Sequence, residues 1–119
     1  MAADQRKRRE LKLTALPGVQ ADFDQLPNDA VRKMALDQLV LIRDGKVSGM
    51  PLGDHVDTGD LSDCYKLYFD PDGSQKPRFR LVYRYTPNEI QAVAIEPVAV
   101  GRRRNHEVYQ ITSSRLRRR

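Results

Sequence analysis

The stretch YKLYFDPDGSQKPRFRLVYRY, residues 65–85, decides the fold that the sequence predicts. It holds two runs in which aromatic or aliphatic residues alternate with Lys or Arg, and a period of two is typical of a strand. Between the runs, DPDGSQKP supplies the Asp, Gly and Pro residues of a turn. We therefore expect strands over residues 63–70 and 78–85 that form an antiparallel hairpin.

The alternation gives the predicted hairpin two different faces. The apolar face carries Tyr65, Leu67, Phe69, Phe79, Leu81 and Tyr83. The opposite face carries the cations, together with a few smaller or aromatic residues: Cys64, Lys66, Tyr68, Arg78, Arg80, Val82 and Arg84. A cationic sheet face of this kind is suited to holding a phosphodiester backbone.

Helices are predicted before the hairpin. Asn28 is a suitable N-cap and Gly45 a suitable C-terminal stop for a helix over residues 28–45. Its apolar residues recur at helical spacing, which predicts one buried stripe: Val31, Met34, Ala35, Leu39 and Ile42. Residues 19–26 predict a shorter helix, and the alternating LKLTAL of residues 11–16 predicts a half-buried strand.

The other segments complete an α+β fold. Residues 89–100 predict a third strand, which follows the two strands of the hairpin, and Pro97 marks a bulge or an edge position near its end. The Gly- and Asp-rich residues 45–60 predict an exposed loop, and a short helix is optional from about Asn105. The order β-α-α-β-β-β predicts a mostly antiparallel four-stranded sheet with two helices packed on one face and the other face open.

Length and charge limit the classes of protein. The chain has 119 residues and a net charge of +5, and we expect a basic extension over residues 1–10 and a single domain over residues 11–117. Residues 11–100 carry a net charge of −3, whereas residues 101–119 carry +6. A basic C-terminal segment fits RNA, DNA or an acidic protein segment as a partner, and equally fits a solvated tail.

No membrane, disulfide, metal or cofactor chemistry is expected. The chain has one cysteine, and its apolar runs are too short to span a membrane, so we expect a cytoplasmic protein. DPDGS lacks the further ligands of a calcium loop, and GDHVDTGDLSDC lacks the spacing of a metal site.

Three motifs in the second half, DCYKLYF, FRLVYR and VAVGRRRNHEVY, occur in an order and spacing that resembles the RelE toxins of bacterial type II toxin–antitoxin pairs. The resemblance covers residues 11–116. It implies a ribosome-dependent endoribonuclease that cuts mRNA in the ribosomal A site without a metal, by attack of a 2′-hydroxyl on the adjacent phosphate. It also implies an antitoxin that neutralises the enzyme through an acidic or amphipathic segment, lying over the cationic face or displacing the C-terminal helix. Operator DNA would be bound only through the toxin–antitoxin complex.

The resemblance assigns roles to four residues. Lys66 would accept the 2′-OH proton or activate that hydroxyl electrostatically. Arg80 would stabilise the phosphate, for which a planar guanidinium is well shaped. Arg103 would act as the acid or stabilise the transition state, and Tyr109 would orient an mRNA base or phosphate.

One position departs from the family pattern. Where the best-known member has a second lysine, this chain has Tyr68, which carries no positive charge at neutral pH. His106 is a substitute acid, because its ordinary pKa lies near neutrality, and Glu107 is a partner for it or for a nearby arginine. Five further arginines are candidates for contacting mRNA or rRNA: Arg78, Arg84, Arg102, Arg104 and Arg115.

Two other functions remain open on the same scaffold. The first is a ParE-like inhibitor of DNA gyrase, which acts by protein binding and has no chemical need for this cationic cluster. The second is a non-catalytic member that binds its antitoxin and helps to repress their operon. Without the resemblance, Lys66 and Arg80 would be solvated cations on an exposed strand, and Tyr109 a core residue.

Overall fold

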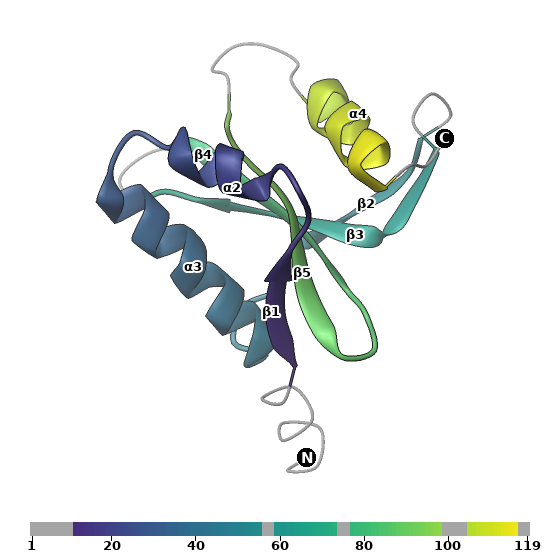
Figure 1. Cartoon of the computed structure of the whole chain (residues 1–119), viewed down its shortest axis with the longest axis horizontal. Coiled ribbons are helices and arrows are strands. Elements are labelled where there is room, and N and C mark those ends of the chain that lie inside the picture. The colour runs from purple at the N-terminus through teal and green to yellow at the C-terminus, as the bar shows by residue number, and fades with distance from the viewer. Residues whose placement is uncertain (1–10, 56–58, 74–76, 99–104, 117–119) are drawn as a thin grey trace.

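The computed structural model describes residues 11–55, 59–73, 77–98 and 105–116 (Figure 1), and gives the backbone alone for residues 53–55, 59–62 and 105–109. The predicted N-terminal extension, residues 1–10, lies outside the described residues. In chain order the elements are β1 (Lys12–Ala15), α2 (Val19–Asp24), α3 (Asp29–Arg43), β2 (Met50–His55), β3 (Gly59–Phe69), β4 (Phe79–Tyr85), β5 (Glu89–Pro97) and α4 (Asn105–Leu116).

The sheet confirms the predicted α+β class and the predicted hairpin. Its strands lie in the order β1-β5-β4-β3-β2, with β1 parallel to β5 and the other pairs antiparallel. In the hairpin, Tyr65 lies opposite Tyr83 and Lys66 opposite Val82. The alternation of residues 65–85 therefore sets the register of the two strands, because a shift by one residue would move every apolar side chain to the wrong face.

The predicted number of four strands was wrong, because part of the predicted loop over residues 45–60 forms a fifth strand. The segment MPLGDH pairs with β3 as the edge strand β2. Pro51 and Gly53 have low strand propensity, and the register shifts between them. Pairing with a long neighbouring strand overrides these local preferences, and an edge is where a sheet tolerates proline.

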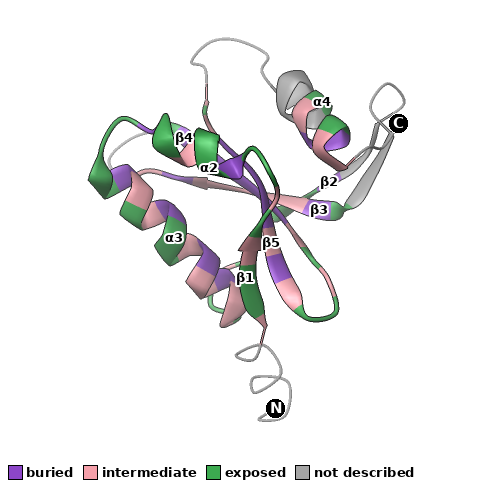
Figure 2. Ribbon diagram, in the orientation of Figure 1, coloured by how far each residue is buried: buried purple, intermediate pink, exposed green. Residues whose placement is uncertain are grey.

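The helices α2 and α3 cover one face of the sheet, as predicted. The Asn28 side chain accepts a hydrogen bond of 3.1 Å from the Val31 amide, which confirms the expected N-cap. Buried residues of α3 alternate with exposed ones along the helix (Figure 2) and form one stripe toward the sheet: Val31, Ala35, Leu39 and Ile42. The aliphatic and aromatic side chains of β4 and β5 complete this core.

The second face of the sheet is not open, which corrects the sequence-based expectation. A second apolar cluster lies on it, made by Leu52, Cys64, Val82, Val93 and Ala94, with Ile111 and Leu116 of α4 packed against it. The signal for this was the continuous apolar run of residues 92–95, since a strand buried on both faces has no polar alternation.

A buried tyrosine ties the loop before β2 to the central strand. Tyr83 is fully buried, and its hydroxyl accepts a 2.8 Å hydrogen bond from the Gly49 amide. Burial raises the pKa of the Tyr83 phenol above its ordinary value. Gly49 must lack a side chain, because a Cβ there would lie 2.5 Å from the Lys66 carbonyl oxygen.

Replacing Tyr83 by phenylalanine tests this contact. The Gly49 amide would lose its partner, so we expect a loss of about 1 kcal/mol in the free energy of unfolding. Urea denaturation measures that loss, and faster hydrogen exchange of the Gly49 amide localises it. Unchanged values for both would show that the hydrogen bond does not stabilise the loop.

Candidate functional site

Two of the four predicted catalytic residues come together on the α4 side of the sheet. Lys66 of β3 alternates onto the same face as Cys64, and Arg80 of β4 onto the same face as Val82. Tyr68 lies directly opposite Arg80 in the register. Its ring lies near both cations, with its centroid 5.8 Å from Lys66 Nζ and 5.9 Å from Arg80 Cζ. These are cation–π distances, so Tyr68 links the two cations.

Arg80 is paired and buried, which corrects the expectation that it points out of an uncovered face. Its Nη2 lies 2.6 Å from Oε1 of Glu96, which is opposite Arg80 on β5. The Arg80 side chain is 1% exposed and that of Glu96 19% exposed. A phosphate can therefore reach the Arg80 guanidinium only if this pair opens. Glu96 was not among the predicted site residues, although a carboxylate on the neighbouring strand that alternates onto the same face as Arg80 was a signal for it.

Arg78 stabilises the hairpin. Its guanidinium donates hydrogen bonds of 2.7 and 2.9 Å to the two carboxylate oxygens of Asp70 and one of 3.0 Å to Asp72. The hydrogen bonds with Asp70 raise the pKa of Arg78 and hold the pKa of the Asp70 carboxyl well below its usual range. The predicted RNA contact of Arg78, which is exposed, stays a prediction.

The Asp70–Arg78 pair gives a testable pH dependence. Because the pKa of Asp70 is lower in the folded than in the unfolded chain, its stabilising contribution is full above the unfolded value, about pH 4, and is lost as the pH falls below it. Asp70→Asn is therefore expected to flatten the fall in unfolding free energy below pH 4. Urea denaturation between pH 2 and 7 measures this, with Asp72→Asn as control. Equal slopes in wild type and Asp70→Asn would contradict it.

The other described candidate arginines are also held by neighbours. Arg84 donates a 2.8 Å hydrogen bond to Gln91 and lies 4.0 Å from Asp63. Arg115 of α4 forms a bidentate pair with Asp22 of α2. Contact of either arginine with RNA stays a prediction.

The remaining predicted site residues belong to the end of the chain. Arg102, Arg103 and Arg104 lie outside the described residues. The backbone positions of His106, Glu107 and Tyr109 are in the first half of α4. The helix as a whole contacts β3 and β5. The helix that carries Tyr109 therefore lies on the same face of the sheet as Lys66 and Arg80.

The described residues include neither a cluster suited to a metal ion nor a helix suited to a bilayer. No three His, Cys, Asp or Glu side chains of the described residues are grouped so as to hold a metal ion. Within the described part of the chain, none of the helices combines the length and apolar character needed to cross a bilayer.

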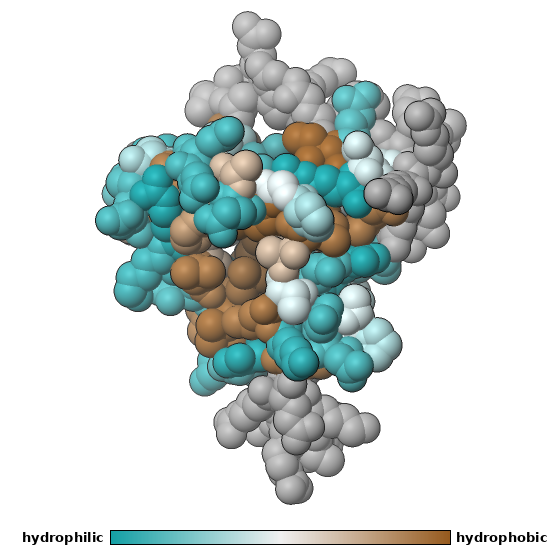
Figure 3. Space-filling view, viewed as in Figure 1, coloured by the Kyte–Doolittle hydropathy of each residue, from teal (hydrophilic) through white to brown (hydrophobic). Residues whose placement is uncertain are grey.

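An apolar hollow lies away from the cationic cluster. It has a volume of about 690 Å³ and is bordered by β1, α2 and α3. Leu13 and Leu36, which are 38% and 52% exposed, lie on its border. Figure 3 shows it as a hydrophobic area between α3 and β1. The alternation of residues 11–16 does not indicate it, because the hollow is lined by side chains from β1, α2, α3 and β5.

The comparisons with known proteins bear on the fold. No family model matches the sequence, and no curated protein matches it significantly. Among solved structures, the fold is similar to that of the E. coli toxin RelE, a mutant with two arginines replaced by alanine, in the free state. The TM-score is 0.59 at 17% sequence identity, and the match covers 90% of this chain and 98% of the other. The chain therefore has a RelE-like fold.

Proposed function

We propose that this protein is the toxin of a type II toxin–antitoxin pair and a ribosome-dependent mRNA endonuclease. Its partners are then mRNA on the ribosome and a cognate antitoxin, with operator DNA bound only through the toxin–antitoxin complex. The antitoxin would offer an acidic or amphipathic segment, and the pair would act in the cytoplasm. The proposal needs no metal or other cofactor.

The observation that carries the proposal is the convergence of Lys66, Tyr68 and Arg80 on one face of the sheet, which α4 also covers. These residues come from two strands, and the resemblance to RelE toxins assigns catalytic roles to both cations. The RelE-like fold adds independent support, because it rests on the backbone and not on the motifs.

The proposed reaction is a transesterification. The 2′-oxygen forms a bond to phosphorus while the bond to the 5′-oxygen breaks, which leaves a 2′,3′-cyclic phosphate and a 5′-hydroxyl. Lys66 accepts the 2′-OH proton or stabilises the developing oxyanion, and Arg80 stabilises the crowded phosphorane. His106 gives a proton to the leaving oxygen, and Arg103 stabilises the negative charge that develops there, because a guanidinium stays protonated in proteins. Tyr109 and Tyr68 hold the flanking nucleotides, since a phenol ring stacks on any base.

In this mechanism the scissile phosphate competes with Glu96 for Arg80. The pair must open when mRNA binds, and the phosphate then takes the place of the carboxylate. The 1% exposure of Arg80 also favours a second candidate, the non-catalytic partner of an antitoxin, in which the Arg80–Glu96 pair is purely structural. The two candidates differ in whether the chain cuts RNA.

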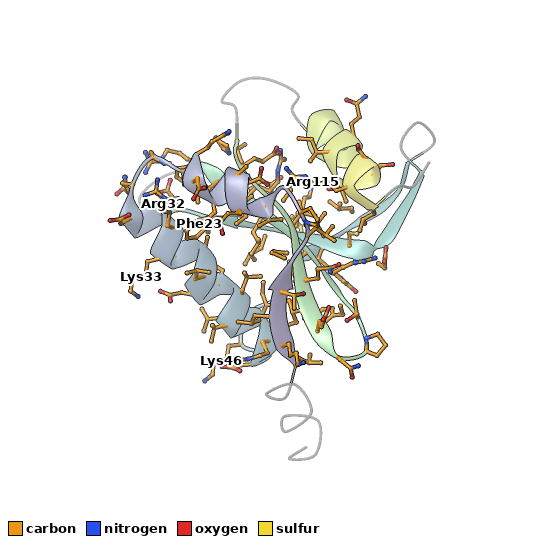
Figure 4. The ribbon with its side chains drawn as sticks, in the orientation of Figure 1. Phe23, Arg32, Lys33, Lys46 and Arg115 are labelled. Carbon is orange, nitrogen blue, oxygen red and sulfur yellow. The ribbon has the colours of Figure 1, made fainter. Side chains whose placement is uncertain are left out.

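Mapping mRNA 5′ ends on ribosomes tests the proposal. Wild-type protein is expected to give cuts in phase with codons in the A site, and the Arg80→Ala/Arg103→Ala variant is expected to lose them. A variant that removes two exposed cations from the opposite side, Lys33→Ala/Lys46→Ala, controls for lost net charge (Figure 4) and should keep the cuts.

Other outcomes would identify the alternatives. Growth inhibition with altered DNA supercoiling and no mRNA cuts would support a gyrase inhibitor. The absence of both growth inhibition and cuts would support the non-catalytic partner. Cuts that persist in the Arg80→Ala/Arg103→Ala variant would show that the assigned residues are not catalytic.

A further inference from the structure

A partly buried junction joins three elements that are far apart in the sequence. Arg115 of α4 donates hydrogen bonds of 2.6 and 2.9 Å to the two oxygens of Asp22 on α2, and one of 2.7 Å to the Val93 carbonyl of β5. The side chains of Arg115 and Asp22 are 22% and 18% exposed. Figure 4 shows Arg115 between α2 and α4. Hydrogen bonds between charged groups in partly buried sites are the strong ones.

The junction also completes the edge of the sheet. β1 pairs with β5 only as far as Ala92, whose carbonyl accepts a hydrogen bond from the Leu16 amide. Beyond that point the Val93 carbonyl is bound by Arg115, and the Ile95 amide donates a 3.0 Å hydrogen bond to Asp22. Beyond the end of β1, Asp22 thus accepts a hydrogen bond from a backbone amide of β5, and Arg115 donates one to a backbone carbonyl of β5.

The backbone around the junction leaves room for the guanidinium. Gly18 precedes α2 with a φ of 100°, which L side chains rarely adopt. A Cβ at Gly18 would lie 3.0 Å from Arg115 Nε. The carbonyls at the end of α2 are in turn held by Arg32, which donates to the carbonyl oxygens of Phe23, Asp24 and Leu26. The hydrogen bonds from Arg32 therefore stabilise the helix that carries Asp22.

Residues 111–116 of α4 also contact the second face of the sheet through apolar and small polar side chains. The described residues of α4 that contact the apolar cluster are Ile111 and Leu116, and both are only partly buried. Thr112 and Ser113 are buried, and Thr112 Oγ1 has no hydrogen-bond partner among the described residues. Burying the Thr112 hydroxyl without a partner costs free energy, which reduces the gain from the apolar packing of Ile111 and Leu116. The bonds of Arg115 offset that cost.

The junction also adjoins the cationic cluster. Glu96, which binds Arg80, follows Ile95 directly on β5. The hydrogen bonds that Arg115 donates to Asp22 are the main cause of the raised pKa of Arg115, and the negative charge of Glu96 also contributes. A single stretch of β5 therefore carries the partner of Arg80 and binds the pair that anchors α4.

We propose that Asp22 and Arg115 are positioning residues for the candidate site. The pair holds α4 across the sheet, so that the first half of α4, which carries His106 and Tyr109, lies at a fixed place relative to Lys66 and Arg80. The effect on catalysis rests on the proposed function, whereas the anchoring of α4 does not. Under this proposal Arg115 serves the reaction by holding α4 in place, whether or not it also makes the predicted contact with RNA.

Hydrogen exchange on the full chain tests the anchoring. In Asp22→Asn the Ile95 contact can persist, but the charge that binds Arg115 is gone. We expect amides of α4 to exchange about ten- to a hundred-fold faster, with β4 amides unchanged. The matched control is Asp24→Asn, since Asp24 lies on the same helix, is exposed and bonds to Gln20. Unchanged α4 exchange in Asp22→Asn would overturn the proposal.

A second variant separates charge from geometry. Arg115→Lys keeps the charge but cannot bind both Asp22 oxygens and the Val93 carbonyl at once. It is expected to weaken α4 protection about as much as Asp22→Asn does. Full protection in Arg115→Lys would show that a simple ion pair is sufficient, and would also overturn the proposal.

Single-turnover cleavage on ribosomes tests the catalytic consequence. Both variants are expected to lower the rate of the chemical step about ten- to a hundred-fold, with mRNA cut at the same positions and ribosome affinity nearly unchanged. Fast α4 exchange with an unchanged cleavage rate would confirm the anchor and overturn the positioning role. If the wild-type protein gives no cuts, the proposed function and the positioning role both fail, and the exchange data still decide the anchoring.

Discussion

Replacing Glu96 by alanine is expected to destabilise the protein by about 3 kcal/mol. The change leaves the Arg80 guanidinium, which is 1% exposed, without the carboxylate that lies 2.6 Å away. Removing one partner of a buried ion pair typically costs about 3–5 kcal/mol, and we expect the lower end because Glu96 keeps 19% exposure. Urea denaturation at neutral pH measures the loss.

Two further variants show whether this loss of stability arises because the buried Arg80 cation has lost its carboxylate. Glu89→Ala removes a carboxylate from the same strand, where it accepts only a long, 3.3 Å hydrogen bond from Thr14, and should cost under about 1 kcal/mol. Replacing both partners, as Arg80→Met/Glu96→Leu, should recover most of the stability lost in Glu96→Ala. If the double variant is as unstable as the single one, the cause is lost packing and not the loss of the carboxylate that binds Arg80.

Replacing Lys66 by alanine is expected to lower the cleavage rate on ribosomes at least about a hundred-fold. Loss of a positioned acid or base costs about 10²–10⁴-fold in rate, and loss of a preorganised cation near a developing charge costs a similar amount. Single-turnover cleavage of a defined mRNA measures the rate of the chemical step. A rate within ten-fold of the wild type would exclude Lys66 from the reaction.

The variant Lys66→Arg separates the two roles left open for this residue. An arginine keeps the positive charge but does not accept a proton in proteins, because it is never deprotonated. A rate as low as that of Lys66→Ala therefore identifies Lys66 as the proton acceptor, and a rate near the wild type identifies it as an electrostatic activator. Lys33→Ala, on the exposed side of α3, is the control for removing one cation and should not change the rate.

Local periodicity explains what could be predicted from the sequence. The alternation of residues 65–85 and the helical spacing from Val31 to Ile42 each depend on neighbours a few positions away, and the structure reproduces both. The same information placed Lys66, Tyr68 and Arg80 on one face. It failed for residues 50–55, where Pro51 and Gly53 indicate a loop and pairing with β3 makes a strand.

Contacts between distant residues explain what could not be predicted. Asp22 and Arg115 are 93 positions apart, and Arg80 and Glu96 are 16 apart on different strands. An arginine in a basic segment has the same local pattern whether it is solvated, binds RNA or meets a carboxylate from another element. The sequence therefore indicates which residues are cationic, but the tertiary fold decides which of them are neutralised by a carboxylate.

The parallel pairing of β1 with β5 determines how late in its synthesis the chain can complete its fold. Lys12 pairs with Glu89, so the first strand has no place in the sheet until most of the chain has been translated. At about 5–20 residues per second, that interval lasts on the order of 4–15 seconds. During that interval the sheet lacks its β1 edge, so the native fold cannot be completed before β5 has been synthesised.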